Sequence, residues 1–292
     1  MHSIKTFTAV LMAGCLLFSG GSLIPSGILS PAAVSAAEGD YELNDYVLFD
    51  EDTCSMTIND ITIDNDWGVM LNVTCENKTE DRVQMFTLGN ASVNTYLIDP
   101  FWADEVEAGA SHESSIAFSI EEMESYGITS ADEICFDLTV FDSNDFSAEP
   151  FYADSFTIYP TGLSEGDVFI PEYDPAEDAQ ALVQDDRLSF IYEYSEKDDF
   201  WGYALYVYLD NRTDQTLKYA LSEVKVNGVD CDPFWQTVVA PDRRGRVRIA
   251  FFALEDLGVT GDVTDVSFRL TVSDNNDWEA EPLVDESFEI QP

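Results

Sequence analysis

Four short segments rich in Asp and Asn have the side-chain oxygens that a calcium ion needs, and an aromatic residue follows each of them. Calcium takes roughly six to eight oxygen ligands, but none of these segments has the Gly and Glu spacing of an EF-hand loop. Tight turns select the same residue types, because Asp and Asn tolerate a left-handed backbone and hydrogen bond to their own main chain. Turn formation is therefore the favoured interpretation and calcium binding is the alternative. The candidate calcium ligands are Asp142, Asn144, Asp145, Asp274, Asn276 and Asp277.

An Asp-Pro-Phe-Trp motif occurs twice, at 99–102 and at 232–235. In each copy the tryptophan follows a proline at the end of an expected strand, where an exposed indole could stack on a sugar ring or on a partner's side chain. Trp102 and Trp235 are therefore candidate binding residues. Large aromatic side chains in a small domain usually belong to its core. The favoured interpretation is that both motifs close the open end of a β-sandwich.

Cys54 and Cys75 lie on either side of a turn at 64–66. A hairpin centred between residues 64 and 65 would place the two cysteines opposite each other, both on the core-facing side of their strands. The sequence therefore predicts a Cys54–Cys75 disulfide. It would close a loop of about 20 residues and contribute roughly 3 kcal/mol to stability. The alternative is that both are small buried hydrophobic residues. Neither Cys135 nor Cys231 has an expected partner.

Charge and histidine content exclude several function classes. The chain has 57 Asp and Glu against 13 Lys and Arg, and a net charge of −44. Such a surface repels nucleic acid and anionic membranes. Of the two histidines only His112 lies beyond the N-terminal segment, which disfavours a histidine-based catalytic triad and a zinc site built on several imidazoles. We therefore expect no enzyme, and a carboxylate-based hydrolase is the least favoured alternative.

Four arginines stand close together at 243, 244, 246 and 248. The corresponding segment of the first half of the chain has Ser111, His112 and Glu113 instead. A basic stripe in an acidic chain could dock on the other half of the chain or on a second copy. Solvated surface charge without a partner is the favoured interpretation.

These groups lie on a sequence pattern that occurs twice. Trp67-Gly68 recurs as Trp201-Gly202, and Ile116-Ala117-Phe118 recurs as Ile249-Ala250-Phe251, in the same order as the Asp-Pro-Phe-Trp motifs. Within each copy, hydrophobic and polar residues alternate with a period of two, which is typical of antiparallel strands with one buried face. One short helix is expected in each copy, at 120–126 and at 253–257, before a glycine.

The sequence thus predicts an all-β fold, with two tandem immunoglobulin-like β-sandwich domains after a signal peptide. The first β-sandwich repeat spans 38–162 and the second spans 163–292, joined by a linker at 160–166. A small barrel is the alternative for each repeat.

Residues 1–37 contain no Asp or Glu, and an apolar run at 8–18 precedes the small residues at 32–37. This pattern is typical of a secretory signal peptide and predicts a secreted or cell-surface protein. Cys15 follows Met12-Ala13-Gly14, which resembles a degenerate lipobox. A lipid anchor at Cys15 is less favoured, because the apolar run continues after the cysteine.

A resemblance to a known family rests on three segments of the second repeat. They are the Val-Asn-Gly-x-x-x-Asp-Pro-Phe-Trp stretch at 226–235, Ile249-Ala250-Phe251, and the Leu-Glu-Asp-Leu-Gly segment at 254–258. In these segments the sequence is similar to small immunoglobulin-like extracellular domains, often in tandem, of exported or membrane-tethered proteins of Gram-positive bacteria. The resemblance covers both repeats, although the first has Asn94-Thr95 where the second has Asn227-Gly228. It implies a β-sandwich and an extracytoplasmic location, and it implies no catalytic residues.

The leading hypothesis is a non-enzymatic secreted or cell-surface module that binds a protein or a glycan through loops at the ends of the sandwiches. No cofactor is expected, with calcium as the one alternative. The runner-up is a structural spacer of the cell envelope without a ligand of its own.

Overall fold

The computed structural model describes residues 41–176, 178–198, 202–233, 235–277 and 279–292. Within them the chain forms eighteen strands, one short α-helix and one 3-10 turn, so the all-β prediction is confirmed. The predicted signal peptide and Cys15 lie outside the described residues. No helix within the described part of the chain is long and apolar enough to cross a membrane.

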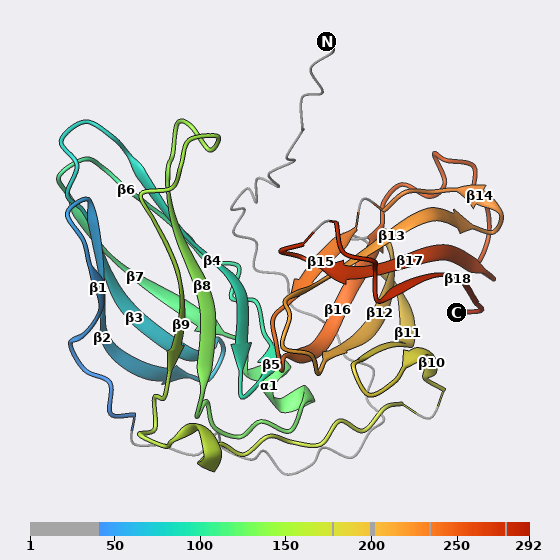
Figure 1. Ribbon diagram of the computed structural model, residues 1–292, viewed down its shortest axis with the longest axis horizontal. Helices are drawn as coiled ribbons and strands as arrows, with labels where there is room; N and C mark the ends of the chain where they lie inside the picture. The colour runs from blue at the N-terminus through green and yellow to red at the C-terminus, as the bar shows by residue number, and fades with distance from the viewer. Residues whose placement is uncertain (1–40, 177, 199–201, 234, 278) are drawn as a thin grey trace. The chain divides into compact units, whose positions relative to one another are not determined.

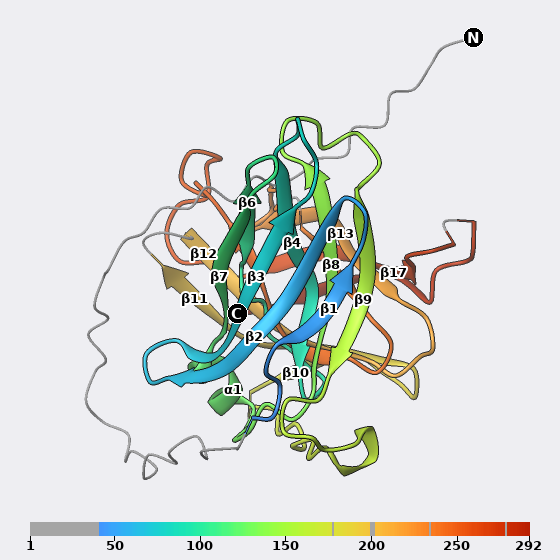
Figure 2. The same cartoon turned by 90° about the vertical axis from the view of Figure 1, so that its left-hand side faces the viewer.

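The first repeat contributes nine strands to two sheets. β1, β2, β3 and β7 form a four-stranded sheet, while β4 pairs with β5, β6 and β8, and β8 pairs with β9. In Figure 2 the four-stranded sheet faces the viewer, with β4 and β8 behind it. The elements are β1 (Tyr46–Asp50), β2 (Cys54–Asp64), β3 (Gly68–Asn77), β4 (Gln84–Val93), β5 (Tyr96–Leu97), β6 (Ala103–Val106), β7 (Ser111–Phe118), α1 (Ile120–Ser125), β8 (Ile134–Asp142) and β9 (Tyr152–Ile158).

The second repeat has nine strands of the same lengths in the same order, labelled β10 to β18 in Figure 1. Its pairings repeat those of the first, with β10-β11-β12-β16 on one side and β14-β13-β17-β18, plus β15 on β13, on the other. The strands, preceded by η1 (Glu165–Asp167), are β10 (Gln180–Gln184), β11 (Leu188–Asp198), β12 (Gly202–Asn211), β13 (Leu217–Val226), β14 (Val229–Asp230), β15 (Gln236–Val239), β16 (Arg244–Phe251), β17 (Val266–Asp274) and β18 (Val284–Ile290).

Local irregularities of the backbone also recur. The register between β2 and β3 shifts between Ile58 and Asp60, and that between β11 and β12 shifts between Tyr192 and Tyr194. The turn after β4 has positive φ at Asn94 (46°) and Thr95 (72°), and the turn after β13 has φ of 49° and 76° at Asn227 and Gly228. A two-residue hairpin turn needs this conformation. The first repeat therefore forms the same turn with a β-branched residue that disfavours it.

Each repeat has its own hydrophobic core, because alternate strand residues point inward. Leu71, Val73 and Ile116 are fully buried in the first core, and Leu205, Leu209 and Ile249 in the second. The two repeats are also hydrogen bonded to each other: β16 pairs in parallel with β5 at Arg244 and Tyr96, which joins eight strands and the branch strand β6 into one nine-stranded sheet.

One of the two predicted helices is present. α1 occupies 120–125, capped by the Ser119 hydroxyl, which accepts a hydrogen bond from the backbone N–H of Glu122. The predicted helix at 253–257 is wrong, since this segment forms turns. The reason is length: seven residues lie between Phe251 and Val259, whereas nine lie between the equivalent Phe118 and Ile128.

The arginines of β16 and of the turn before it dock on the first repeat. Arg243 Nη2 lies 3.3 Å from Glu133 Oε1 and 2.9 Å from Cys135 Sγ. The backbone N–H of Arg244 donates to the Thr95 carbonyl at 3.1 Å. Gly245 permits the close approach, because a Cβ there would lie 2.9 Å from Leu97 Cβ. The favoured expectation of unpartnered surface charge is therefore wrong, and the alternative of docking on the other repeat is confirmed.

The predicted Cys54–Cys75 disulfide is not formed, and the four cysteines of the described residues are free thiols. The assumed register was wrong. The hairpin closes at Asp64 and Gly68 and contains a bulge, so that Cys54 pairs with Asn77 and Cys75 pairs with Met56. Both thiols are fully buried in the first core, which fits the alternative that they are small hydrophobic residues.

Candidate binding site

Both tryptophans of the Asp-Pro-Phe-Trp motifs pack against the cores. The Trp102 indole Nε1 donates to Ser114 Oγ at 3.0 Å, and the half-buried ring lies against the first core. Trp235 meets Phe190 edge to face, with ring centroids 6.5 Å apart. The geometry therefore follows the packing interpretation. It is Phe101, the residue before Trp102, that reaches the surface, with 78% of its area exposed.

The Asp-rich loops use their carboxylates to form turns. Asp142 Oδ1 accepts the backbone N–H of Asn144 at 3.0 Å, and Asp274 Oδ1 accepts that of Asn276 at 2.8 Å. Asp145 accepts both the hydroxyl and the backbone N–H of Ser147, and these bonds lower the pKa of its carboxyl. Asp277 Oδ1 accepts the backbone N–H of Glu279 at 3.1 Å. Among the described residues, no group of three or more His, Cys, Asp or Glu side chains converges on one point.

Turn formation predicts that calcium acts only as a screening ion. We expect the melting temperature of residues 38–292 to rise equally in CaCl₂ and in NaCl of the same ionic strength, because salt screens the self-repulsion of a chain with net charge −44. Differential scanning calorimetry in both salts measures this. A further rise specific to calcium, removed by a chelator, would instead assign the loops as ligands.

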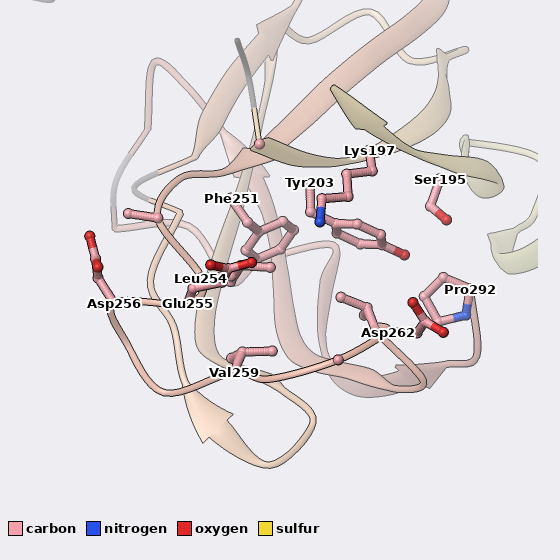
Figure 3. A pocket seen from close by; sticks show the side chains of 14 residues that line it. Ser195, Lys197, Tyr203, Phe251, Leu254, Glu255, Asp256, Val259, Asp262 and Pro292 are labelled. Carbon is pink, nitrogen blue, oxygen red and sulfur yellow. The ribbon is translucent and has the colours of Figure 1, made fainter. Parts of the chain in front are cut away.

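A pocket of about 500 Å³ opens at one end of the second repeat, and we call it the end pocket. Its floor is apolar, formed by the buried Phe251 of β16 and by Val259. Figure 3 shows the Tyr203 ring beside Phe251, with Asp256 pointing away from both rings. Gly202 is required at the edge of this floor, since a Cβ there would lie 2.5 Å from the Phe251 carbonyl oxygen.

The end pocket exists because the second repeat lacks a helical plug. In the first repeat, Met123 of α1 packs on the core at the equivalent end and is only 1% exposed. The backbone bond from Ile128 to Met123 is repeated from Val259 to Leu254, which identifies Leu254 as the equivalent residue. Because the second repeat is two residues shorter here, Leu254 is only half-buried and lines the pocket wall.

Acidic and apolar side chains surround the mouth of the end pocket. Glu255, Asp256 and Asp262 line it, against Lys197 as the one basic side chain of the lining. Phe252 and Leu257, in the same turn segment, are 54% and 50% exposed. A cavity with an apolar floor and few polar groups at its edge is typical of a binding site. A ligand segment that carries an apolar side chain next to basic residues fits the apolar floor and the acidic rim best.

The residues of the end pocket were not among the candidates from sequence. The signal that could have found them is the comparison of the two repeats, since the deletion after Phe251 is visible in the sequence. His112, the single histidine of the described residues, has Nδ1 2.8 Å from Asp104 Oδ1 on β6. It does not line the end pocket.

The sequence shows no match to known families. A comparison with protein-family models finds no matching family, and a comparison with curated proteins finds no matching protein.

Proposed function

We propose that this chain is an exported, non-enzymatic binding module, built from two tandem immunoglobulin-like sandwiches at 38–162 and 163–292 behind a signal peptide. Support for the tandem arrangement comes from the two sets of nine strands with matching lengths, pairings and bulges. Support for export comes from the composition of residues 1–37. The likeness to immunoglobulin-like extracellular domains of Gram-positive bacteria agrees with both.

In this proposal the second repeat binds a protein partner in the end pocket. The observation that carries it is the difference between the repeats: the same core end is covered by α1 in one copy and carries the end pocket in the other. The apolar floor would take one apolar or aromatic side chain of the partner. Neighbouring Lys or Arg residues of the partner would meet the acidic rim, which also accelerates association with a basic surface.

Selection from a displayed library of random peptides on immobilised residues 38–292 tests this function. We expect the selected peptides to contain an apolar or aromatic residue flanked by Lys or Arg, and their affinity to fall as NaCl is raised. The double variant E255K/D262K should weaken binding at least about tenfold through charge reversal at the rim. Fluorescence polarisation of a labelled peptide measures the dissociation constant.

The matched control is Glu286→Lys, alone and doubled with Glu289→Lys. Both residues are exposed on β18 and line no part of the end pocket. The double control variant changes the net charge by the same amount as E255K/D262K. Because neither control residue lies at the end pocket, the peptide affinity should differ little from that of the unaltered protein. Absence of any selected peptide, or equal loss in both variants, would leave the spacer hypothesis in place of binding at this pocket.

A further inference from the structure

A second cavity, distinct from the end pocket, is lined by aromatic and charged side chains of both repeats. Its volume is about 480 Å³. β16 and its neighbours in the second repeat form one wall, and the segments at 97–101 and 122–126 of the first repeat form the other. We call it the tyrosine cleft, and its lining includes Phe101, Glu122, Tyr126, Tyr194, Tyr206 and Arg248.

Phe101 is held at the tyrosine cleft in an unfavourable backbone conformation. Its φ is 46°, in the left-handed region that bulky residues avoid. Its backbone N–H donates to Asp99 Oδ1 at 2.8 Å, which fixes this turn. An exposed aromatic side chain on a strained backbone is a feature that gathers at ligand sites, because neither solvation nor backbone energy explains its retention.

Two tyrosines form a stacked aromatic pair in the same cleft. Tyr194 on β11 pairs across the strands with Tyr206 on β12, and their rings stack with centroids 4.5 Å apart. The Arg246 guanidinium lies 5.8 Å from the Tyr194 ring centroid and is itself bound to Glu193. The rings are thus fixed before any ligand arrives, while Tyr194 remains 40% exposed. Such preorganisation reduces the entropy lost on binding.

Charges of both signs lie beside these rings. Glu122 and Asp99 line the tyrosine cleft together with Arg248. Desolvation raises the pKa of the Glu122 carboxyl, and the nearby charge of Asp99 adds to this effect, whereas Arg248 opposes it. Carboxylates accept hydrogen bonds from hydroxyl groups and arginine donates to them. The mixture offers directed hydrogen bonds to a polar ligand without selecting for net charge.

We propose that the tyrosine cleft binds a neutral carbohydrate. The apolar C–H face of a sugar ring fits the flat, exposed ring of Phe101, and the partly exposed tyrosine pair adds aromatic contact beside it. The hydroxyl groups of the sugar fit the carboxylate and guanidinium groups of the cleft. Anionic sugars are disfavoured by the net charge of −44. A purely apolar ligand would take water from the Glu122 carboxylate without offering it a hydrogen bond, which is unfavourable.

A printed array of neutral and anionic oligosaccharides tests the proposal, followed by calorimetry of residues 38–292 with the neutral oligosaccharide that binds best. We expect neutral glycans to bind with an affinity that is insensitive to NaCl, unlike peptide binding at the end pocket. The variant F101A should weaken glycan binding by about tenfold or more, since it removes one stacking face. E122Q should also weaken it.

Trp67→Ala is the matched control for Phe101→Ala. Trp67 is 64% exposed at the turn between β2 and β3 and does not line the tyrosine cleft, so W67A should bind glycans as the unaltered protein does. Circular dichroism verifies that both variants are folded. An array without neutral ligands, a preference for anionic glycans, or equal effects of F101A and W67A would each overturn the proposal. The E255K/D262K variant should bind glycans as the unaltered protein does, which separates the tyrosine cleft from the end pocket.

Discussion

Replacing Arg246 by alanine is expected to lower the free energy of unfolding of residues 38–292 by about 3 kcal/mol. The Arg246 guanidinium binds both carboxylate oxygens of Glu193, with Nη2 at 3.2 Å from Oε1 and Nε against Oε2. The Glu193 side chain is only 2% exposed. Without the arginine this carboxylate stays buried with a single partner, the Tyr173 hydroxyl at 2.9 Å.

The cost is large because the lost pair is buried. A carboxylate that has lost its ion partner in a protein interior keeps most of its desolvation penalty, and removing one partner typically costs about 3–5 kcal/mol. Arg246 is 26% exposed, so water can reach part of the vacated space, which places the expected loss at the lower end. The guanidinium also lies 5.7 Å from the Tyr126 ring centroid of the first repeat, and this contact is lost as well.

Arg269→Ala is the matched control in the same repeat. Its ion pair with Asp285 joins neighbouring strands, but both side chains are 40% exposed, and exposed pairs contribute at most about 1 kcal/mol. Urea denaturation followed by circular dichroism measures all variants. The double variant R246A/E193A should cost clearly less than the sum of the two single variants, because the second change removes the orphaned carboxylate. Equal losses in the free energy of unfolding for R246A and R269A would show that the buried ion pair contributes no more than the exposed one.

Much of the fold could be predicted from sequence because it depends on local patterns. The alternation along 69–73 and its counterpart in the second repeat specify strands with one buried face, and the glycines after each short helix or turn mark where it stops. The packing of Trp102 against the core could also be predicted, since large aromatic residues gain most from burial.

The remaining features depend on relations between segments, which single patterns do not contain. One bulge and a longer hairpin turn shift the partner of Cys75 from Cys54 to Met56. The arginine stripe looks like solvated charge until β16 is seen to meet β5 at Arg244. The end pocket follows from a deletion whose effect is apparent only when Met123 is seen to fill the matching space in the first repeat. For the arginine stripe and the end pocket, a difference between the repeats marks the place where the second copy has gained a contact or a cavity.

Alkaline pH is expected to unfold the protein cooperatively between pH 10 and about 12, because several tyrosines must keep their protons while they are buried. Burial raises the pKa of Tyr126 from 10.0 to about 12. Burial also raises the pKa of Tyr173, Tyr208 and Tyr219 well above its ordinary value. Tyr208 and Tyr219 are 2% and 0% exposed, respectively.

The direction of the effect follows from proton linkage. Above pH 10 the unfolded chain releases these phenolic protons while the folded chain still holds them, so a rise in pH favours the unfolded state. Each such tyrosine lowers the free energy of unfolding by about 1.4 kcal/mol per pH unit within this window. Four of them together lower it by roughly 5 kcal/mol per unit, against a typical stability of about 5–15 kcal/mol. Below pH 10 their contribution to stability is complete and independent of pH.

The measurement is a pH titration that follows tyrosinate absorbance and far-ultraviolet circular dichroism together. We expect both signals to change at one midpoint, since the buried tyrosines ionise only when the fold is lost. Tyr219→Phe should raise this midpoint and reduce the pH slope, because it removes one retained proton. It should not lower stability at neutral pH, since the Tyr219 hydroxyl is buried without a hydrogen-bond partner among the described residues. Gradual ionisation near pH 10 with an unchanged dichroism spectrum would show instead that these rings are open to solvent.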